Sequence, residues 1–314
     1  MSLAALIKGR RGTNGFGFAS TADEVTAGID LTGKRVLVTG VTSGIGAETA
    51  RVLAARGAHV IGTARTAARA AAALAPLGPG TTAAACELGD LASVDACVAG
   101  LVASGQPLDV IICNAGIMAL PHLATIHGVE QQFFTNHVGH AALVTGLLDA
   151  LAADARVVML SSSAHMFAPA GGIEFDNLSG ARGYSRWRAY GQSKLANLLF
   201  AVELGRRFAG TARTANAVHP GVIPTKLGRH LGGALAVMSA ITRPLVTKTI
   251  PQGAATSCYV ACHPGAADSS GAYFADCNVA RASAHGRDRA LAERLWHVTE
   301  EIVARVRAGA STAA

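Results

Sequence analysis

Half of the 314 residues are hydrophobic, 15% are charged and 36 are glycine, which is typical of a tightly packed globular protein and excludes a disordered chain. The formal net charge is +7, but the basic residues are scattered and lack the interleaved aromatic residues of a nucleic-acid platform. We therefore expect small anions, and no nucleic acid, among the ligands.

The first 30 residues are rich in Gly, Thr and Ser and show no regular pattern, so we expect residues 1–30 to form an arm that packs on the domain. Basic residues near the start are not followed by an apolar stretch, which argues against a cleaved signal peptide. The longest weakly polar segment, 231–242, is too short to span a bilayer. We expect no transmembrane segment, and contact with a membrane surface is left open.

From residue 35 onward, short β-branched runs alternate with alanine-rich stretches, a pattern that predicts a parallel sheet with helical crossovers. The seven candidate strands are residues 35–40, 58–64, 81–88, 109–116, 155–162, 211–221 and 271–275. Their apolar continuity indicates helices on both faces of the sheet. The candidate helices are residues 44–56, 65–75, 91–104, 123–152, 188–209, 251–262 and 287–307. This predicts one doubly wound, seven-stranded parallel α/β domain over residues 31–307, with a flexible tail at 308–314.

The segment TGVTSGIG, residues 39–46, lies between the first strand and the first helix. Glycine adopts positive φ and has no side chain to hold a ligand away, so a pyrophosphate could rest on the amide groups that begin the helix. An ordinary tight turn is the alternative, but the flanking strand and helix favour a dinucleotide site. The candidate cofactor contacts in this loop are Gly40, Ser43, Gly44, Ile45 and Gly46.

The end of the second strand predicts which dinucleotide is bound. An acidic residue there would accept hydrogen bonds from an unmodified ribose, but this chain has Arg65 and no carboxylate. A guanidinium suits a 2′-phosphate, with Ser43 as a helper, so we expect NADP(H) to be preferred and NAD(H) to be the alternative. The other interpretation of Arg65 is that it begins a solvated helix.

Two further strand ends meet the same edge of the predicted sheet. Glu87 and Leu88 end the third strand, where the carboxylate could meet the adenine amino group, and a surface cap is the alternative role of Glu87. Asn114, Ala115 and Gly116 end the fourth strand, and Asn114 could instead be a turn residue. We expect all five residues to contact the cofactor.

Tyr190 and Lys194 are four residues apart, so a helix places them on one side. A free phenol has a pKa of about 10, and a nearby cation would favour the phenolate, which would make the tyrosine a usable acid and base. A packed tyrosine beside a solvated lysine is the alternative. The serines at 161–163 could hydrogen-bond a reacting oxygen. Asn136 either holds a water beside the lysine or fills the interior of the 123–152 helix.

Taken together, these motifs resemble the short-chain dehydrogenase/reductase family, non-extended branch, over nearly the whole chain. The matching elements are TGxxxGIG at 39–46, N-A-G at 114–116, YxxxK at 190–194 and PGxIxT at 220–225. The resemblance implies a single-domain Rossmann fold and an NAD(P)-dependent oxidoreductase. Glu87 stands where the family usually has aspartate and Cys113 where it has the first asparagine of N-N-A-G, and both changes look tolerable because the backbone does much of the binding there.

The resemblance also implies a role for each residue of a catalytic tetrad. Tyr190 would be the general acid/base, Lys194 would lower its pKa and hold the nicotinamide ribose, and Asn136 would complete the tetrad. Ser162 would orient the reacting carbonyl or alcohol, because the family places its serine second after the last aliphatic residue of the strand, here Leu160. The expected contacts of the cofactor's carboxamide end are Pro220, Gly221, Ile223 and Thr225.

Within the family, the chain is similar to the retinol dehydrogenase, WW-domain oxidoreductase and protochlorophyllide reductase group, which implies a bulky, apolar alcohol, aldehyde or ketone as the small-molecule substrate. We expect residues 226–248 to form much of a substrate lid. A homodimer or homotetramer through the helices at 123–152 and 188–209 is left open, since the insertion before Tyr190 could obstruct it.

Three other functions fit the sequence less well. A catalytically silent redox-sensing module would keep the glycine loop and lose the tetrad, whereas all four positions are filled here. A serine hydrolase using Ser162 and His165 would need a GxSxG elbow, which the sequence lacks. His137 and His140 have no carboxylate or cysteine to complete a metal site. The six cysteines show no CxxC spacing and suggest reduced thiols and a cytoplasmic protein.

Overall fold

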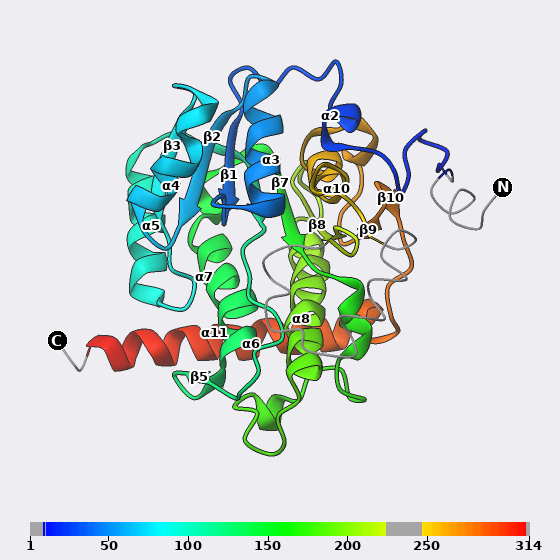
Figure 1. Ribbon diagram of the computed structural model, residues 1–314. Coiled ribbons are helices and arrows are strands. Elements are labelled where there is room, and N and C mark those ends of the chain that lie inside the picture. The colour runs from blue at the N-terminus through cyan, green and yellow to red at the C-terminus, as the bar shows by residue number, and fades with distance from the viewer. Residues whose placement is uncertain (1–8, 10, 224–246, 312–314) are drawn as a thin grey trace.

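A central sheet organises the computed structural model, which describes residue 9 and residues 11–223 and 247–311 (Figure 1). The sheet has eight strands in the order β10-β9-β8-β7-β4-β1-β2-β3. The bounds of the strands are β1 (Arg35–Thr39), β2 (His59–Ala64), β3 (Thr81–Ala85), β4 (Leu108–Cys113), β7 (Leu151–Leu160), β8 (Thr214–His219), β9 (Tyr273–Ala275) and β10 (Asn278–Val279). Because β1 has β2 on one side and β4 on the other, the strand order reverses there, and the crevice at the carboxyl ends of these strands is where such folds bind ligands.

The alternation of side chains along each strand divides the interior into two cores. Leu37 of β1 and Ile111 of β4 point into one core, whereas Val36 and Val38 point into the other. The first core is covered by α5 (Leu91–Ala103), α7 (Gly139–Gly146), α8 (Arg186–Arg207) and α11 (Arg289–Ser311). The second is covered by α2 (Ala22–Val25), α3 (Gly44–Ala55), α4 (Ala67–Leu74) and α10 (Ile250–Cys262). The doubly wound fold predicted from the sequence is therefore confirmed.

The predicted count of seven parallel strands is corrected by an eighth strand, β10, which pairs antiparallel with β9. The two strands form a tight hairpin through Asp276 and Cys277, whose φ angles are 52° and 62°. Turns of this type normally use asparagine, aspartate or glycine at both central positions. Cys277 gives no such signal, so the sequence alone did not reveal the hairpin.

The single helix expected at residues 123–152 is wrong. The segment begins with a hairpin of β5 (Thr125–Ile126) and β6 (Val129–Glu130), because His127 and Gly128 both have positive φ. Helical structure follows as α6 (Gln131–Phe133), a π-helical turn (Phe134–Val138) and α7, and Leu151 then begins β7. The apolar residues that suggested one long helix are instead shared between the hairpin, the helices and the strand.

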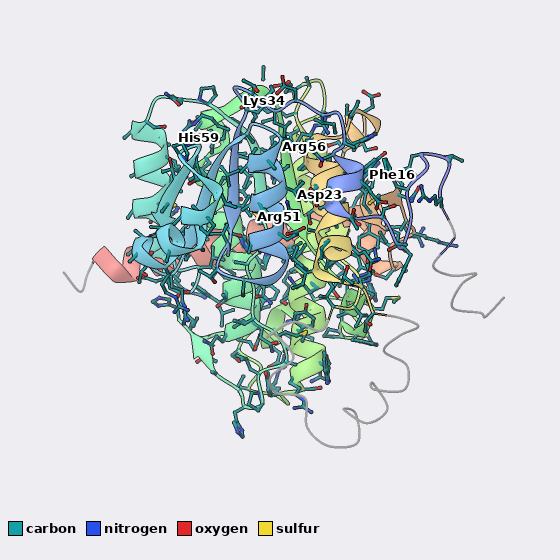
Figure 2. The ribbon with its side chains drawn as sticks, turned by 45° about the horizontal axis from the view of Figure 1, so that its top comes forward. Phe16, Asp23, Lys34, Arg51, Arg56 and His59 are labelled. Carbon is teal, nitrogen blue, oxygen red and sulfur yellow. The ribbon has the colours of Figure 1, made fainter. Side chains whose placement is uncertain are left out.

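Within residues 11–30, α2 packs against α3 and α10 (Figure 2). The expected irregular arm contains a short helix, α2, in which Asp23 forms an ion pair of 2.5 Å with Arg51 of α3. Asn14 Nδ2 donates to the carbonyl oxygen of Cys277 at 2.7 Å, which attaches the arm to the β9–β10 turn. At the other end, α11 continues to Ser311 and not only to residue 307.

Helix α11 lies across α8, where the ring of Trp296 stacks on Phe200 with centroids 5.0 Å apart. The guanidinium of Arg207 lies 4.0 Å from the centre of the Trp296 ring. This packing covers part of the surface of α8 with the protein's own C-terminal helix. None of the helices in the described ranges combines the length and the apolarity that a bilayer span requires.

Gly139, the first residue of α7, lies against the backbone at the edge of the sheet, and substituting it tests how close this approach must be. A Cβ at this position would overlap the carbonyl oxygen of Leu88, which is backbone and cannot move aside cheaply. We predict that Gly139→Ala lowers the free energy of unfolding by about 1–3 kcal/mol, measured by chemical denaturation. As a control, Gly100→Ala in α5 meets nothing within 4 Å and should raise it by about 0.5–1 kcal/mol. Equal effects of the two substitutions would contradict this account.

Candidate active site

The glycine loop after β1 is built for close backbone approach. Gly40 has a φ of 75°, in the left-handed region that glycine tolerates. At Gly46 a Cβ would overlap Gly40 O and Asn114 Nδ2, so only glycine lets the start of α3 lie this close to the loop and to the end of β4. The amide groups at the helix start are thereby held at the sheet edge.

The N-terminus of α3 has the features of an anion site. Its N-cap, Ser43, is exposed, and the side chain makes no capping hydrogen bond. The first turn of α3 contains no acidic residue, so the positive end of the helix is not neutralised. Ile45 is partly buried and lies towards Gly253 of α10. Backbone amides, an unengaged hydroxyl and the helix dipole together fit the pyrophosphate of a dinucleotide.

The N-A-G element after β4 is fixed to the end of β1 by Thr39. The amide groups of Asn114 and Ala115 both donate to Thr39 Oγ1 at 2.9 Å. Asn114 Nδ2 also donates to Thr39 O at 2.8 Å. Asn114 is therefore a bracing residue between the two strands, and its side-chain amide is engaged with the glycine loop.

The positions expected to contact the adenosine end lie along the same edge. Arg65 follows β2 and is exposed, so its guanidinium can meet a ligand from solvent. Glu87 accepts a hydrogen bond from the amide of Gly89 at 3.1 Å, in the turn that leads to Asp90, the N-cap of α5. Leu88 is buried and packs in the core.

Tyr190 and Lys194 lie on α8 with their side chains near one another, since Lys194 Nζ is 5.7 Å from the centre of the Tyr190 ring. Lys194 is only 3% exposed, and its ammonium donates to the carbonyl oxygen of Leu160, the last residue of β7, at 2.9 Å. The hydroxyl of Ser162, which follows that strand end by two residues, lies near the Tyr190 phenol and acts to lower its pKa. The structure thus brings three of the four predicted catalytic side chains together.

Burial controls the protonation of this pair. It raises the pKa of Tyr190 to about 12, against the smaller opposing effect of the neighbouring Ser162 hydroxyl. It lowers the pKa of Lys194 to about 8. From the sequence we expected Lys194 to lower the pKa of the phenol, but in the structure desolvation outweighs any such effect. The proton therefore stays on Tyr190 at neutral pH.

The three adjacent serines have different partners. Ser161 is buried, and its hydroxyl donates to the carbonyl oxygen of Lys194 at 2.7 Å, which ties the strand end to α8. The backbone amide of Ser163 donates to Nδ1 of His219 at 3.2 Å. Ser162 is the serine whose hydroxyl affects the pKa of the Tyr190 phenol, which favours it for the role given to it by the family resemblance.

Asn136 lies in the π-helical turn and is fully buried. Its Oδ1 accepts the amide of Ile117 at 2.8 Å, and its Nδ2 donates to Ile117 O at 2.9 Å and to Ser193 Oγ at 3.0 Å. A Cβ on Gly116 would lie 2.9 Å from Asn136 Oδ1 and 3.6 Å from Lys194 Nζ. Gly116 therefore leaves room for both side chains beside the N-A-G element, but the amide of Asn136 is already engaged with protein partners.

The PG element after β8 reaches the same region. Gly221 has a φ of 90°, and Pro220 beside it is buried. Ile223 packs against Gly253 of α10, close to where Ile45 of the glycine loop lies. Thr225, and most of the lid expected at 226–248, lie outside the described residues.

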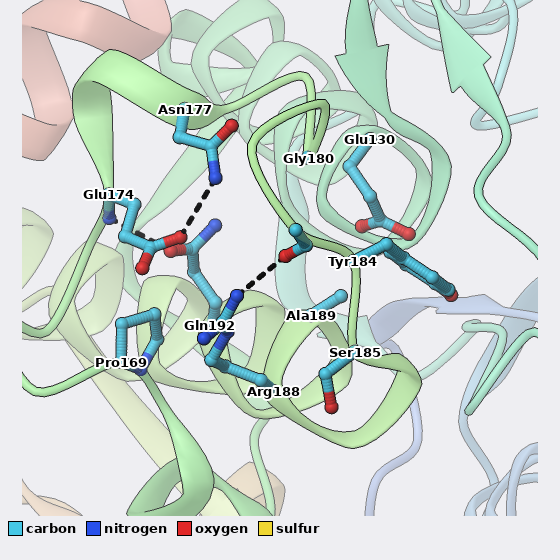
Figure 3. A pocket seen from close by; sticks show the side chains of 11 residues that line it. Glu130, Pro169, Glu174, Asn177, Gly180, Tyr184, Ser185, Arg188, Ala189 and Gln192 are labelled. Carbon is cyan, nitrogen blue, oxygen red and sulfur yellow. Dashed lines mark hydrogen bonds between the residues drawn. The ribbon is translucent and has the colours of Figure 1, made fainter.

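Residues of the insertion between β7 and α8, together with Glu130 and the start of α8, line a small open pocket (Figure 3). Its volume is about 20 Å³, enough for about one water molecule and too small for a substrate. Its lining includes Glu130, Glu174, Tyr184 and Arg188. We therefore assign this pocket a structural role in the insertion.

Several residues that organise the site were missed in the sequence. They are Thr39, which serves both the glycine loop and the N-A-G element, and three histidines that bond the backbone of site residues, His140, His165 and His219. Thr39 belongs to the TGxxxGIG motif, but its hydroxyl contacts lie far away in the sequence. No local pattern marks these histidines, because their partners are main-chain groups.

Comparisons with known proteins identify the family of the chain. The profile of the family described as "short chain dehydrogenase" matches residues 34–234. "Short-chain dehydrogenase TIC 32 A, chloroplastic" of Brassica napus is 42% identical over 317 residues, covering 96% of this chain and 99% of the relative. "Retinol dehydrogenase 12" of Homo sapiens is 40% identical over 282 residues, covering 88% of each chain.

Among solved structures, this chain is similar to a blue fluorescent protein from a metagenomic library in complex with NADPH. The TM-score is 0.64 at 25% sequence identity, and the match covers 78% of this chain and 97% of that chain. The family profile spans well over half of the sequence, and the relatives match nearly all of it. The chain belongs to the short chain dehydrogenase family of oxidoreductases.

Proposed function

We propose that the protein is an NADP(H)-dependent oxidoreductase that transfers hydride between the nicotinamide and an apolar alcohol, ketone or aldehyde, with Tyr190 as general acid/base. The observation that carries the proposal is the convergence of Tyr190, Ser162 and Lys194 at the end of β7, beside the N-A-G element and the glycine loop. Such an arrangement suits proton transfer to an oxygen whose carbon exchanges hydride.

The residues that would hold the cofactor are those whose geometry fits a dinucleotide. The amides of the glycine loop and Ser43 would bind the pyrophosphate, and Lys194 would bind the nicotinamide ribose. When bound, the cofactor supplies or accepts the hydride. The partly buried Ile223 would contact the nicotinamide end.

The protein's own groups would manage the proton. Burial keeps Tyr190 protonated at neutral pH, so it can donate to a developing alkoxide, while the Ser162 hydroxyl bonds the same oxygen. Lys194, with its pKa lowered to about 8, is still largely charged at pH 7 and would stabilise the phenolate left behind. For oxidation the same steps run in reverse.

The proposed apolar substrate is supported by side chains near the site. Met166 and Phe167, on the turn that follows Ser162, are 65% and 60% exposed. The backbone of this turn packs against α8 at Gly191, next to Tyr190. Trp187, one turn before the tyrosine, has its ring centre 6.4 Å from that of Tyr190. Retinol, which the name of one relative gives as its substrate, is a bulky apolar alcohol of this kind.

Our preference for NADP over NAD rests on Arg65, which is exposed at the end of β2. The NADPH complex of a similar structure supports it. We also propose a reducing compartment such as the cytoplasm, because all six cysteines are unpaired. A homodimer or homotetramer through α7 and α8 would have to accommodate α11, which packs on α8.

We predict that Tyr190→Phe lowers kcat for NADPH-dependent reduction of a panel of lipophilic ketones by at least about 10²-fold, because the variant has no proton to donate. NADPH binding, measured by fluorescence titration, should change little. Tyr259→Phe, which alters another buried tyrosine, in α10, is the control and should keep its kcat. If Tyr190→Phe turned over as fast as the wild type, the proposed role of the phenol would be wrong.

The buried ammonium of Lys194 should lower the free energy of unfolding, although the proposed reaction requires it. Its pKa is lower in the fold than its ordinary value of 10.5, so the charged form is disfavoured by burial. We predict that Lys194→Met lowers kcat but raises the free energy of unfolding at pH 7 by roughly 1–3 kcal/mol. Between pH of about 8 and 10.5 the wild type gains stability, because only the unfolded chain still binds that proton, and the difference between the two proteins should shrink.

Lys34→Met is the matched control for this measurement. The partly exposed Lys34 forms an ion pair of 2.8 Å with Asp109, which raises its pKa, so its removal should lower the free energy of unfolding slightly. A lower free energy of unfolding for Lys194→Met at pH 7 would show that desolvation of the buried ammonium does not destabilise the wild type.

Arg65 offers a test of cofactor choice. A guanidinium that binds a 2′-phosphate contributes a charge-assisted hydrogen bond, so Arg65→Ala should raise the KM for NADPH about tenfold or more and leave the KM for NADH within about twofold. The neighbouring exposed Arg69→Ala is the control and should change neither constant. Equal changes for NADPH and NADH would contradict 2′-phosphate recognition by Arg65.

A further inference from the structure

The hydroxyl of Thr39 has a fully determined set of hydrogen bonds. Its oxygen accepts the amides of Asn114 and Ala115, both at 2.9 Å, and a hydroxyl oxygen has two lone pairs. The single proton of Thr39 must therefore be donated elsewhere. Nε2 of His140 lies 2.9 Å away, whereas the carbonyl oxygen of Ile112 is at 3.5 Å. The shorter contact makes His140 the acceptor.

The protonation state of His140 follows from the same assignment of donors and acceptors. Since Nε2 accepts the Thr39 proton, it carries no hydrogen, and Nδ1 must carry the one hydrogen of a neutral ring. Nδ1 lies 2.8 Å from the carbonyl oxygen of Asn136, which can only accept. Both sides of the ring therefore require the same tautomer, neutral with its proton on Nδ1. Complete burial, which lowers the pKa of His140 to about 4, agrees with the neutral form.

These bonds form one chain that runs across the site in a single direction. It begins at the amides of Asn114 and Ala115, passes through the hydroxyl of Thr39 and the ring of His140, and ends on the carbonyl of Asn136. The side chain of Asn136 returns to the N-A-G segment through both backbone groups of Ile117. The element that would bind the cofactor and the predicted catalytic asparagine are thus joined in a closed ring of contacts.

We propose that His140 is a positioning residue that holds Asn136 in register with the N-A-G element by donating from Nδ1 to Asn136 and accepting at Nε2 from Thr39. It acts through other residues and needs no contact with the substrate. Its effect on turnover rests on the proposed function, whereas its tautomer and its effect on the local backbone do not.

The two hydrogen bonds of His140 can be removed separately. In His140→Asn the side-chain amide nitrogen can take the place of Nδ1 and keep the bond to Asn136. In His140→Gln the longer side chain can place an oxygen near the position of Nε2 and keep the bond to Thr39. His140→Phe removes both. His137 provides the matched control, because it is equally buried in the adjoining π-helical turn but bonds Thr299 of α11 at 2.9 Å.

For turnover of a lipophilic ketone with NADPH, we expect His140→Phe and His140→Gln to lower kcat roughly tenfold or more, with KM for the ketone changed by less than about threefold. His140→Asn should recover most of the wild-type kcat. His137→Asn should lose stability without losing kcat. Equal kcat values for the Asn, Gln and Phe variants at 140, or an equal loss in His137→Asn, would overturn the proposal.

A spectroscopic measurement keeps the test independent of activity. In the full chain labelled with ¹⁵N-histidine, the two ring nitrogens of His140 should show the neutral Nδ1–H pattern at pH 7, with the signals assigned by their loss in His140→Gln. Thr39→Val should shift the Nε2 signal, whereas Thr39→Ser, which keeps the hydroxyl, should shift it much less. An Nε2–H tautomer or a charged ring would overturn the proposal even if the variants were inactive.

Hydrogen exchange gives a second such readout. The amides of Asn114, Ala115 and Ile117 should exchange faster in Thr39→Val and in His140→Phe than in the wild type and the His137→Asn control. If the wild type transferred no hydride to any ketone tested, the proposed function would fail, while the tautomer and the exchange rates would still decide the role of His140. Unchanged exchange in both variants would count against that role.

Discussion

A buried ammonium held against the end of a strand fixes the geometry of the candidate site. Lys194 Nζ donates to Leu160 O, Asn197 Nδ2 donates to the same oxygen at 3.0 Å, and the Ser161 hydroxyl donates back to the carbonyl of Lys194. These three bonds lock α8 to β7. Tyr190, one turn earlier on the helix, and Ser162, just beyond the strand, can meet only because this register is fixed. The same position buries the ammonium of Lys194, and this desolvation lowers its pKa.

Close backbone contact is the second constraint. At Gly191, a Cβ would lie 2.7 Å from Ala164 O, so the residue after the candidate catalytic tyrosine must be small for the turn that follows Ser162 to pack on α8. Gly46 and Gly116 play the same part at the glycine loop and the N-A-G element. Three segments distant in sequence can therefore meet within hydrogen-bonding range. Larger residues at these positions would separate the groups that the proposed reaction needs together.

The sequence predicts features whose signals are local and fails where the cause is distant. The order of strands and helices, the glycine loop and the Tyr190–Lys194 spacing depend on short-range periodicity, and the structure contains them. The helix expected at 123–152 failed because apolar content alone does not distinguish a helix from a hairpin and a strand. The pKa of Tyr190 was misjudged because proximity to Lys194 can be read from spacing, whereas the depth of burial cannot. The hydrogen bonds of Thr39 to Asn114 and His140 link positions 75 and 101 residues away.

Three neutral histidines contact the backbone of site residues, so they add no positive charge to the candidate site. His140 is hydrogen-bonded to the backbone carbonyl of Asn136. Nδ1 of His165 lies 2.6 Å from the backbone carbonyl oxygen of Ser162, and Nδ1 of His219 accepts a hydrogen bond from the amide of Ser163. Burial lowers the pKa of all three, so at neutral pH they serve as rigid, uncharged hydrogen-bonding groups. A charged His140 would repel the Lys194 ammonium and would lower the pKa of Lys194. With these imidazoles neutral, the positive charge beside Tyr190 is that of Lys194, whose Nζ lies 5.7 Å from the centre of the Tyr190 ring.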